Sequence, residues 1–150
     1  MNRSSPKCLF KTQEQFIKAH CLRLLPGQDL KKEIVRLCSE KNILAGCIVS
    51  SVGSLKAINL RLSGSKDFLK KLENFEILSL NGTVSVHGLH LHLALSDHRG
   101  NAMGGHLMDE NIIFTTCELI ILELDSFTFT RPEDSQTGFK ELKIEKLSAK

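Results

Sequence analysis

The residues most able to do chemistry are histidines, and five of the six lie in one stretch, HGLHLHLALSDHRGNAMGGHL, residues 87–107. In a strand formed by HLHLAL, side chains alternate between two faces, so His90 and His92 would point the same way, about 7 Å apart. The leucines between and after them would take the opposite, apolar face. Two imidazoles at this spacing can converge on one metal ion.

A third imidazole follows this pair after a turn. The segment SDHRGN, residues 96–101, reverses the chain, which then reaches Gly104, Gly105 and His106. Two glycines let the backbone pass close beside the preceding strand and bring His106 to the pair. Three neutral imidazoles suit zinc best, with iron, nickel or copper as alternatives, and leave a fourth coordination position for water or substrate. The spacing therefore predicts a reactive metal site at the three histidines.

A metal-free interpretation of the same pattern also stands. A His-x-His pair on a half-exposed strand needs no ion, because the alternation of polar and apolar residues alone accounts for it. His87 is out of phase with His90, and His98 falls in the turn, so both are expected to be surface or hydrogen-bonding residues. A metal site and a plain polar strand face are the two alternatives at this point.

The clearest predicted helix lies in QDLKKEIVRLCSEKN and covers about 29–41. Its apolar residues fall at positions i, i+4, i+7 and i+8, which form one face of a helix: Leu30, Ile34, Leu37 and Cys38. Asp29 is a suitable N-cap, and Asn42 is a suitable left-handed stop.

Most of the remaining sequence is typical of strands. Alternation and β-branched content predict strands in FIKAHCLRLLP, FEILSLNGTVSV, HLHLALS, NIIFTTCELIILEL, SFTFTR and ELKIE. ILAGCIVSSVGSLKAINLRL is predicted as two strands broken near Gly53. A short second helix is predicted at about 66–73, in SKDFLKKLEN, with Phe68, Leu69 and Leu72 inward. Because strands outnumber helices and most connections are short, we expect an α+β fold with a mainly antiparallel sheet.

Length and composition indicate one folded domain. The chain has 150 residues, of which 41% are hydrophobic and 25% are charged, and it is long enough to bury a sizeable core. We predict a single domain at 15–146, preceded by an N-terminal extension at 1–14 and followed by a C-terminal tail at 147–150.

Composition also constrains the compartment and the partners. The five cysteines are scattered and form no CxxC pair, which is typical of free thiols in a reducing compartment. The N-terminus lacks the apolar core of a signal peptide, and no apolar run is long enough to cross a bilayer, so we expect no membrane partner. A net charge of +3 falls well short of a nucleic-acid-binding surface. We expect a soluble cytoplasmic protein, with the nucleus as the alternative compartment.

Several separated motifs together resemble one family. PGQDLKKEI, IVSSVGSLKAINL, FEILSLNGTV, the histidine stretch and TTCELII occur in the order and spacing of the PPC (plants and prokaryotes conserved) domain, also found in plant AT-hook nuclear proteins. The resemblance runs from about Phe16 to Ile144. Plant members replace the histidines and carry an AT-hook, whereas Arg131-Pro132 here lacks the flanking glycine and arginine. We therefore expect no direct DNA binding by this chain alone.

The resemblance implies a homotrimer with a metal site. Histidine-bearing members are similar in fold to acetolactate decarboxylase and to a zinc-dependent ester hydrolase, which hold metal through a His-x-His pair and a later histidine. Carried over to this chain, that pattern falls on His90, His92 and His106, and it favours zinc as the cofactor.

Further candidate residues surround this predicted site. Glu118 in TTCELII matches an acidic position of the family motif and could accept a proton near the metal, with a solvent-facing carboxylate as the alternative. His98 is a second candidate for proton transfer. Ser50, Ser51 and Gly53 could line a pocket at a subunit boundary, although Gly53 is more simply a bend.

Three functions follow as alternatives. The first is a metal-dependent hydrolase or lyase acting on a small substrate. The second is a non-enzymatic trimeric module that binds proteins, at chromatin or elsewhere, as a DNA-associated regulatory module would. The third is a purely structural role, in which the metal only stabilises the hairpin. An open coordination position would argue against this role.

Overall fold

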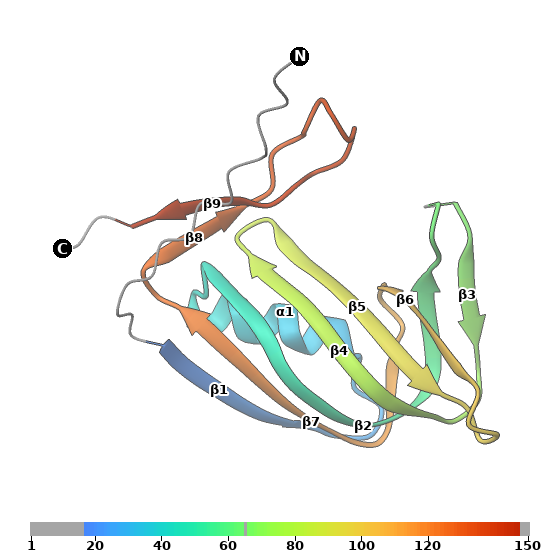
Figure 1. Ribbon diagram of the computed structural model, residues 1–150. Helices are drawn as coiled ribbons and strands as arrows, with labels where there is room; N and C mark the ends of the chain where they lie inside the picture. Colours follow the sequence, from blue (N-terminus) through green and yellow to red (C-terminus); the bar gives the residue numbers. More distant parts are fainter. Residues whose placement is uncertain (1–16, 65, 148–150) are drawn as a thin grey trace.

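The main element of the computed structural model, which describes residues 17–64 and 66–147, is a curved antiparallel β-sheet (Figure 1). The elements are, in chain order, β1 (Ile17–Leu24), α1 (Leu30–Lys41), β2 (Ala45–Arg61), β3 (Phe68–Lys71), β4 (Phe75–Ser85), β5 (Gly88–Ser96), β6 (Ala102–Leu107), β7 (Ile112–Leu124), β8 (Phe127–Thr130) and β9 (Lys143–Lys146). The predicted α+β fold with a mainly antiparallel sheet is confirmed.

The strand order of the sheet is β1-β7-β2-β4-β5-β6, with β3 paired to β2. β2 is one strand of 17 residues, and its end also pairs with β6, where Leu60 lies opposite Leu107 and Arg61 opposite His106. The predicted break near Gly53 is therefore wrong: the pairing of β2 with β7 only shifts register there, and the strand bends without ending. This bend turns β2 back toward β6.

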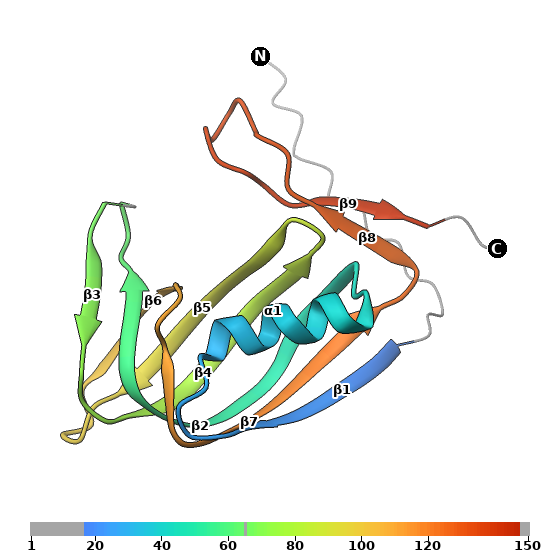
Figure 2. The same ribbon diagram turned by 180° about the vertical axis from the view of Figure 1, so that it is seen from behind.

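The predicted helix is confirmed as α1. The Asp29 carboxylate accepts hydrogen bonds from the backbone N–H groups of Lys31 and Lys32 at 3.0 and 3.2 Å. Asn42 ends the helix in the left-handed conformation, with φ 52° and ψ 45°. Leu30 and Ile34 are fully buried, and Figure 2 shows α1 lying across the hollow side of the curved sheet.

The predicted second helix is wrong. Residues 68–71 form β3, which pairs antiparallel with β2. Phe68 is 52% exposed and Leu72 is 89% exposed, so only Leu69 of the three expected inward residues packs against the core. A helix of two turns is unstable on its own, whereas the free side of β2 supplies a ladder of backbone hydrogen bonds.

The core lies between α1 and the sheet, and β5 shows how it is built. Leu91, Leu93 and Leu95 are at most 1% exposed. Burial of each leucine side chain contributes about 1.5–3 kcal/mol to folding. Because side chains alternate along a strand, this buried row directs His90 and His92 to the other face of β5.

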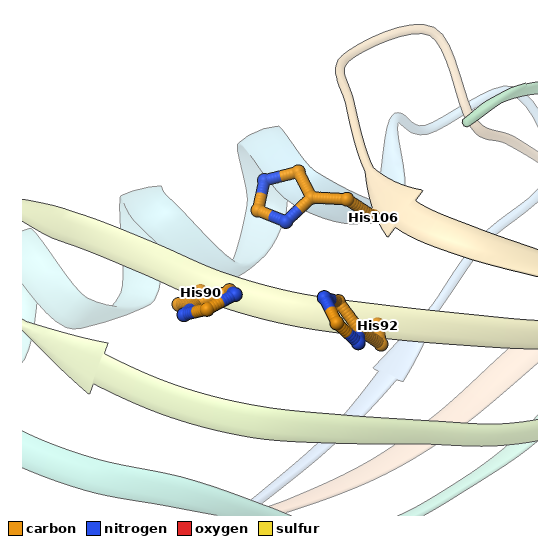
Figure 3. Close-up of side chains that lie close together, drawn as sticks. All are labelled: His90, His92 and His106. Atoms are coloured by element: carbon orange, nitrogen blue, oxygen red, sulfur yellow. The ribbon is translucent and has the colours of Figure 1, made fainter. Parts of the chain in front are cut away.

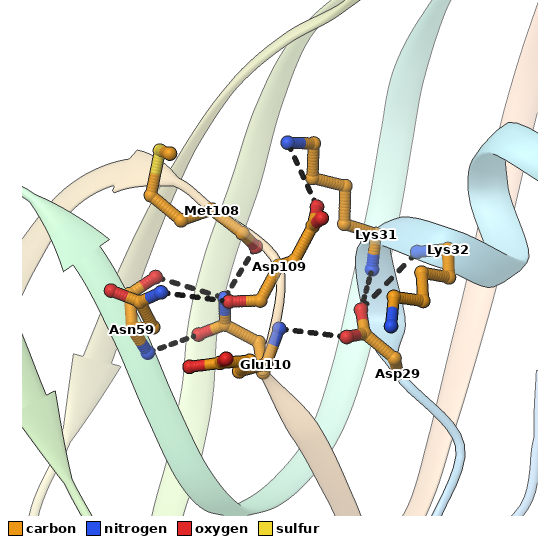
Figure 4. Close-up of polar contacts among 8 residues, drawn as sticks. Asp29, Lys31, Lys32, Asn59, Met108, Asp109 and Glu110 are labelled. Atoms are coloured by element: carbon orange, nitrogen blue, oxygen red, sulfur yellow. Dashed lines mark hydrogen bonds and ion pairs between the residues drawn. The ribbon is translucent and has the colours of Figure 1, made fainter.

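A buried amide network holds the loop between β6 and β7 (Figure 4). Asn111 accepts a hydrogen bond from the backbone N–H of Asn59 at 3.0 Å and donates to the carbonyls of Asn59 and Met108 at 3.0 and 2.7 Å. The Asp29 carboxylate accepts from the backbone N–H of Glu110 at 2.7 Å. The loop is thereby tied to β2 and to the start of α1, which sets the position of β6.

The predicted extension at 1–14 lies outside the described residues, as does the predicted tail at 147–150 apart from Leu147. The predicted domain bounds therefore stay predictions. Within the described residues, no helix has the length and apolar character needed to cross a membrane.

Candidate metal centre

Three histidines converge on one face of the sheet. The ring centroids of His90 and His92 are 5.2 Å apart, those of His90 and His106 are 5.2 Å apart, and those of His92 and His106 are 5.7 Å apart. One ring nitrogen from each residue lies within 4.8 Å of the corresponding nitrogens of the other two. Nitrogens bound tetrahedrally to a zinc ion at about 2.0–2.1 Å lie about 3.3 Å from one another, so small side-chain rotations would bring all three nitrogens into range.

Strand pairing places the rings. His92 on β5 lies directly opposite His106 on β6, and residues directly opposite each other on antiparallel strands point to the same face. His90 is two residues from His92 on β5 and therefore shares this face. The convergence thus depends on the register of the β5–β6 hairpin.

The two glycines before His106 allow the close approach of the strands. A Cβ atom on Gly104 would lie 2.8 Å from the carbonyl oxygen of Leu93, and one on Gly105 would lie 2.7 Å from that of Arg61. Real Cβ atoms essentially never approach this closely. Side chains at these positions would push β6 away from its two neighbours and His106 away from the other histidines.

The donor set fits a divalent metal ion. His106 Nδ1 is buried and has no hydrogen-bond partner among the described residues, and in Figure 3 this nitrogen faces the rings of His90 and His92. A buried polar atom without a partner costs free energy, and a metal ion bound by the three rings would remove that cost.

The electrostatic environment keeps two of the rings uncharged. Burial and the positive charge of Arg61 lower the pKa of His106 to about 4. Burial and the charge of Arg131 lower the pKa of His90 as well. Both rings are therefore neutral at neutral pH, which is the state that binds metal.

A cleft of about 470 Å³ opens beside the histidines. Its charged and polar lining comes from Arg61, His90, His106, Arg131, Lys140 and Glu141. A second hollow of about 370 Å³ is lined by His92 and shares His90, Arg131 and Glu141 with the first. The three histidines thus border space in which a small molecule could sit.

The loop between β8 and β9 supplies part of this cleft. Arg131 follows β8, and its backbone N–H donates to His87 Nδ1 at 2.9 Å, which gives His87 a hydrogen-bonding role. The guanidinium Nη2 of Arg131 donates to Thr83 Oγ1 on β4 at 2.7 Å. Thr83 lies opposite His90 in the β4–β5 pairing, so Arg131 is held beside the histidine face.

The two expected proton-transfer residues lie elsewhere in the chain. Glu118 is exposed on β7, opposite Arg23 and Val52, and two strands of the sheet, β2 and β4, separate β7 from β5. His98 is exposed in the turn between β5 and β6, where its Nε2 accepts a hydrogen bond from Arg99 at 3.3 Å. Neither belongs to the converging group.

The residues expected at a pocket lie on β2. Ser50 is exposed, whereas the hydroxyl group of Ser51 lies 3.5 Å from the Cys117 sulfur. Gly53 has φ 150° and packs against the backbone of Thr116, consistent with its interpretation as a bend.

Arg61, Arg131 and Glu141 are among the cleft residues that sequence reasoning missed. Arg61 reaches the site because the end of β2 pairs with β6. Arg131 and Glu141 reach it through the β8–β9 loop. All three positions depend on contacts between distant segments, and no local motif marks them.

Comparison with known proteins places the chain among relatives of similar fold. It is 41% identical over 132 residues, 88% of its length, to the bifunctional protein GlmU of Synechococcus sp. (strain JA-3-3Ab). The chain spans only 21% of the length of that relative.

Two solved structures match over almost their whole length. A hypothetical protein from Salmonella cholerae-suis has 36% sequence identity and a TM-score of 0.86, with 89% of this chain and 97% of that chain covered. A metal-containing protein from Archaeoglobus fulgidus has 33% identity and a TM-score of 0.72, with 89% of this chain and 99% of that chain covered. The model of the Plants and Prokaryotes Conserved (PCC) domain matches residues 11–125, and the chain therefore belongs to this family.

Proposed function

We propose that His90, His92 and His106 would hold one divalent metal ion, zinc, and that the adjoining cleft would bind a small substrate beside it. The observation that carries the proposal is the convergence of three imidazoles, one of which, His106, has a buried Nδ1 atom without a hydrogen-bond partner among the described residues. The metal-containing relative from Archaeoglobus fulgidus supports the proposal.

The proposed reaction is hydrolysis or a lyase step. When bound, zinc supplies Lewis-acid polarisation of a substrate oxygen. Three protein ligands leave one coordination position open, and the cleft of about 470 Å³ offers space for a substrate there. Glu141 borders both hollows together with His90, so we propose it as the proton acceptor in place of Glu118 and His98.

Metal analysis of untagged protein tests this proposal. We expect about one zinc per wild-type chain and loss of most of that zinc in His92→Ala, because two imidazoles bind zinc much more weakly than three. His98→Ala is the matched control, since this exposed histidine lies outside the group, and it should keep the metal. Wild-type protein that binds no divalent metal would contradict the proposal and favour a non-enzymatic interaction module.

We also propose that the chain assembles as a homotrimer. On β7, Phe114 and Ile120 point away from the core, and both are exposed, at 42% and 37%. Val52 on β2 is 54% exposed and lies opposite outward-facing Glu118, so it belongs to the same face. An apolar face of this kind is typical of a surface that another chain covers.

A further inference from the structure

The cleft beside the histidines has an excess of positive charge. Arg61, Arg131 and Lys140 line it, and Glu141 is the one carboxylate among its described lining residues. None of the three cations forms an ion pair with a described residue. The ion pairs among the described residues are made by other lysines, by Arg36 and by His20. Glu141 interacts electrostatically with Arg131 and offsets part of this charge, but three cations against one carboxylate leave the cleft positive, which favours a negatively charged ligand.

Arg131 is the best prepared of these residues to bind an anion. Its guanidinium is held by one hydrogen bond to Thr83 Oγ1, at 2.7 Å. Its Nε is buried and has no partner in the part of the chain that the structure describes. A guanidinium presents its donors in a planar fork that matches a carboxylate or a phosphate.

The position of Arg131 in the chain is also informative. The family model matches residues 11–125, so Arg131, Lys140 and Glu141 all lie beyond the matched region. The β8–β9 loop therefore places charged residues beside a histidine site that lies in the matched region, and the alignment with the GlmU relative, which covers 132 residues of this chain, extends to Arg131 as well. These loop residues would select the substrate by charge without contributing a metal ligand.

We propose that this cleft binds a small oxyanion, a carboxylate or a phosphate, and that Arg131 is its principal anion-binding residue. The inference rests on the proposed function, because the anionic group would sit beside the metal held by the three histidines. It names the substrate class as small anionic molecules.

Calorimetric titration with inorganic phosphate and with malonate tests the proposal and distinguishes the two oxyanions. Zinc-loaded and metal-free untagged protein are both titrated, and zinc content is measured in the same samples. We expect Arg131→Gln to keep its zinc and to bind the preferred anion at least tenfold more weakly. This factor is about 1.4 kcal/mol, within the range for a charge-assisted hydrogen bond.

Two further variants separate binding from folding. Thr83→Val removes the hydrogen bond that holds the guanidinium but keeps its charge, and we expect a smaller loss of affinity. Arg99→Gln removes an exposed arginine in the β5–β6 turn and should change neither zinc content nor anion affinity.

Each outcome is decisive. Equal affinity of wild type and Arg131→Gln for both anions would overturn the role of Arg131. Zinc-loaded wild type that binds neither anion would overturn the anion site and leave the metal site standing. Wild type without zinc would overturn the proposed function, and titration of that metal-free protein would still decide whether Arg131 binds an oxyanion.

Discussion

At the scale of single residues, the three histidines of the site reach their positions for different reasons. His90 and His92 share a face because alternation along a strand requires it. The reach of His106 follows from the two glycines before it, which leave no Cβ to collide with Leu93 or Arg61. The shared face of His90 and His92 and the return of His106 after the turn are local features, and the sequence was sufficient to predict them. The close approach of Gly105 to Arg61 depends on the distant end of β2 and was not predictable.

Asp97 organises the turn that brings His106 back to His92. Its carboxylate accepts hydrogen bonds from the side chain of Asn101 at 3.0 Å and from the backbone N–H groups of Asn101 and Arg99 at 2.9 and 2.8 Å. The side-chain hydrogen bond from Asn101, followed by the backbone one, lowers the pKa of Asp97 to about 2.

This arrangement predicts a pH dependence for the turn. A carboxyl group with a lowered pKa in the folded state stabilises that state above its unfolded pKa of about 3.9, and the contribution disappears as pH falls toward 2. We expect Asn101→Ala to raise the pKa of Asp97 toward its ordinary value. Side-chain NMR titration of both proteins checks this. An Asp97 that titrates near 4 in wild type would mean that the turn is not held by these hydrogen bonds.

At the scale of elements, the sequence predicts those that depend on local pattern and does not predict those that depend on pairing with a distant strand. α1 was predictable because its apolar periodicity, its cap at Asp29 and its stop at Asn42 are all local. β3 was not, because Phe68, Leu69 and Leu72 fit a helical face equally well. Only the pairing with β2, distant in sequence, decides between a helix and a strand there.

The amide network around Asn111 is the element-scale feature with the clearest energetic consequence. Asn111 is fully buried, and its side chain makes three hydrogen bonds to backbone groups. Asn111→Ala would remove the hydrogen bonds to the Asn59 N–H and the Met108 carbonyl, whereas the Asn59 carbonyl still accepts a hydrogen bond from the Met108 N–H at 3.3 Å. Each buried group left unsatisfied costs about 1–3 kcal/mol. We expect a loss of about 2–4 kcal/mol in the free energy of unfolding, measured by urea denaturation.

A matched control is available on the surface of the same chain. Asn74 is exposed between β3 and β4, so Asn74→Ala should cost much less than Asn111→Ala. Equal losses in the two variants would show that the buried network does not anchor the β6–β7 loop.

At the scale of the whole molecule, the bend in β2 is what completes the site. It lets β2 pair with β7 along one part and with β6 at its end, and so places Arg61 opposite His106. The sequence around Gly53 indicates a change in the strand but not where the strand goes next. Arg61 could not be predicted as a cleft residue for this reason, since it meets the histidines only after the sheet curves.

Assembly is the second property of the whole molecule. If the chain assembles as the proposed homotrimer through the apolar face containing Val52, Phe114 and Ile120, the protein in solution should have a mass three times the 16.8 kDa of the chain. Light scattering coupled to size-exclusion chromatography measures this directly. Val52→Glu should shift the protein toward smaller species by placing a charge in the interface. A monomeric wild type would contradict the trimer.

X-ray absorption at the zinc K edge of untagged, zinc-loaded protein tests the central claim most directly. Imidazole nitrogens lie about 2.0–2.1 Å from zinc, and thiolate sulfur lies about 2.3 Å from it, so the spectrum separates histidine from cysteine ligands. We predict scattering from imidazole nitrogen and light atoms, with no sulfur, and loss of the imidazole signal in His92→Ala. Sulfur at the longer distance would show that cysteines bind the metal and that the three histidines do not form its site.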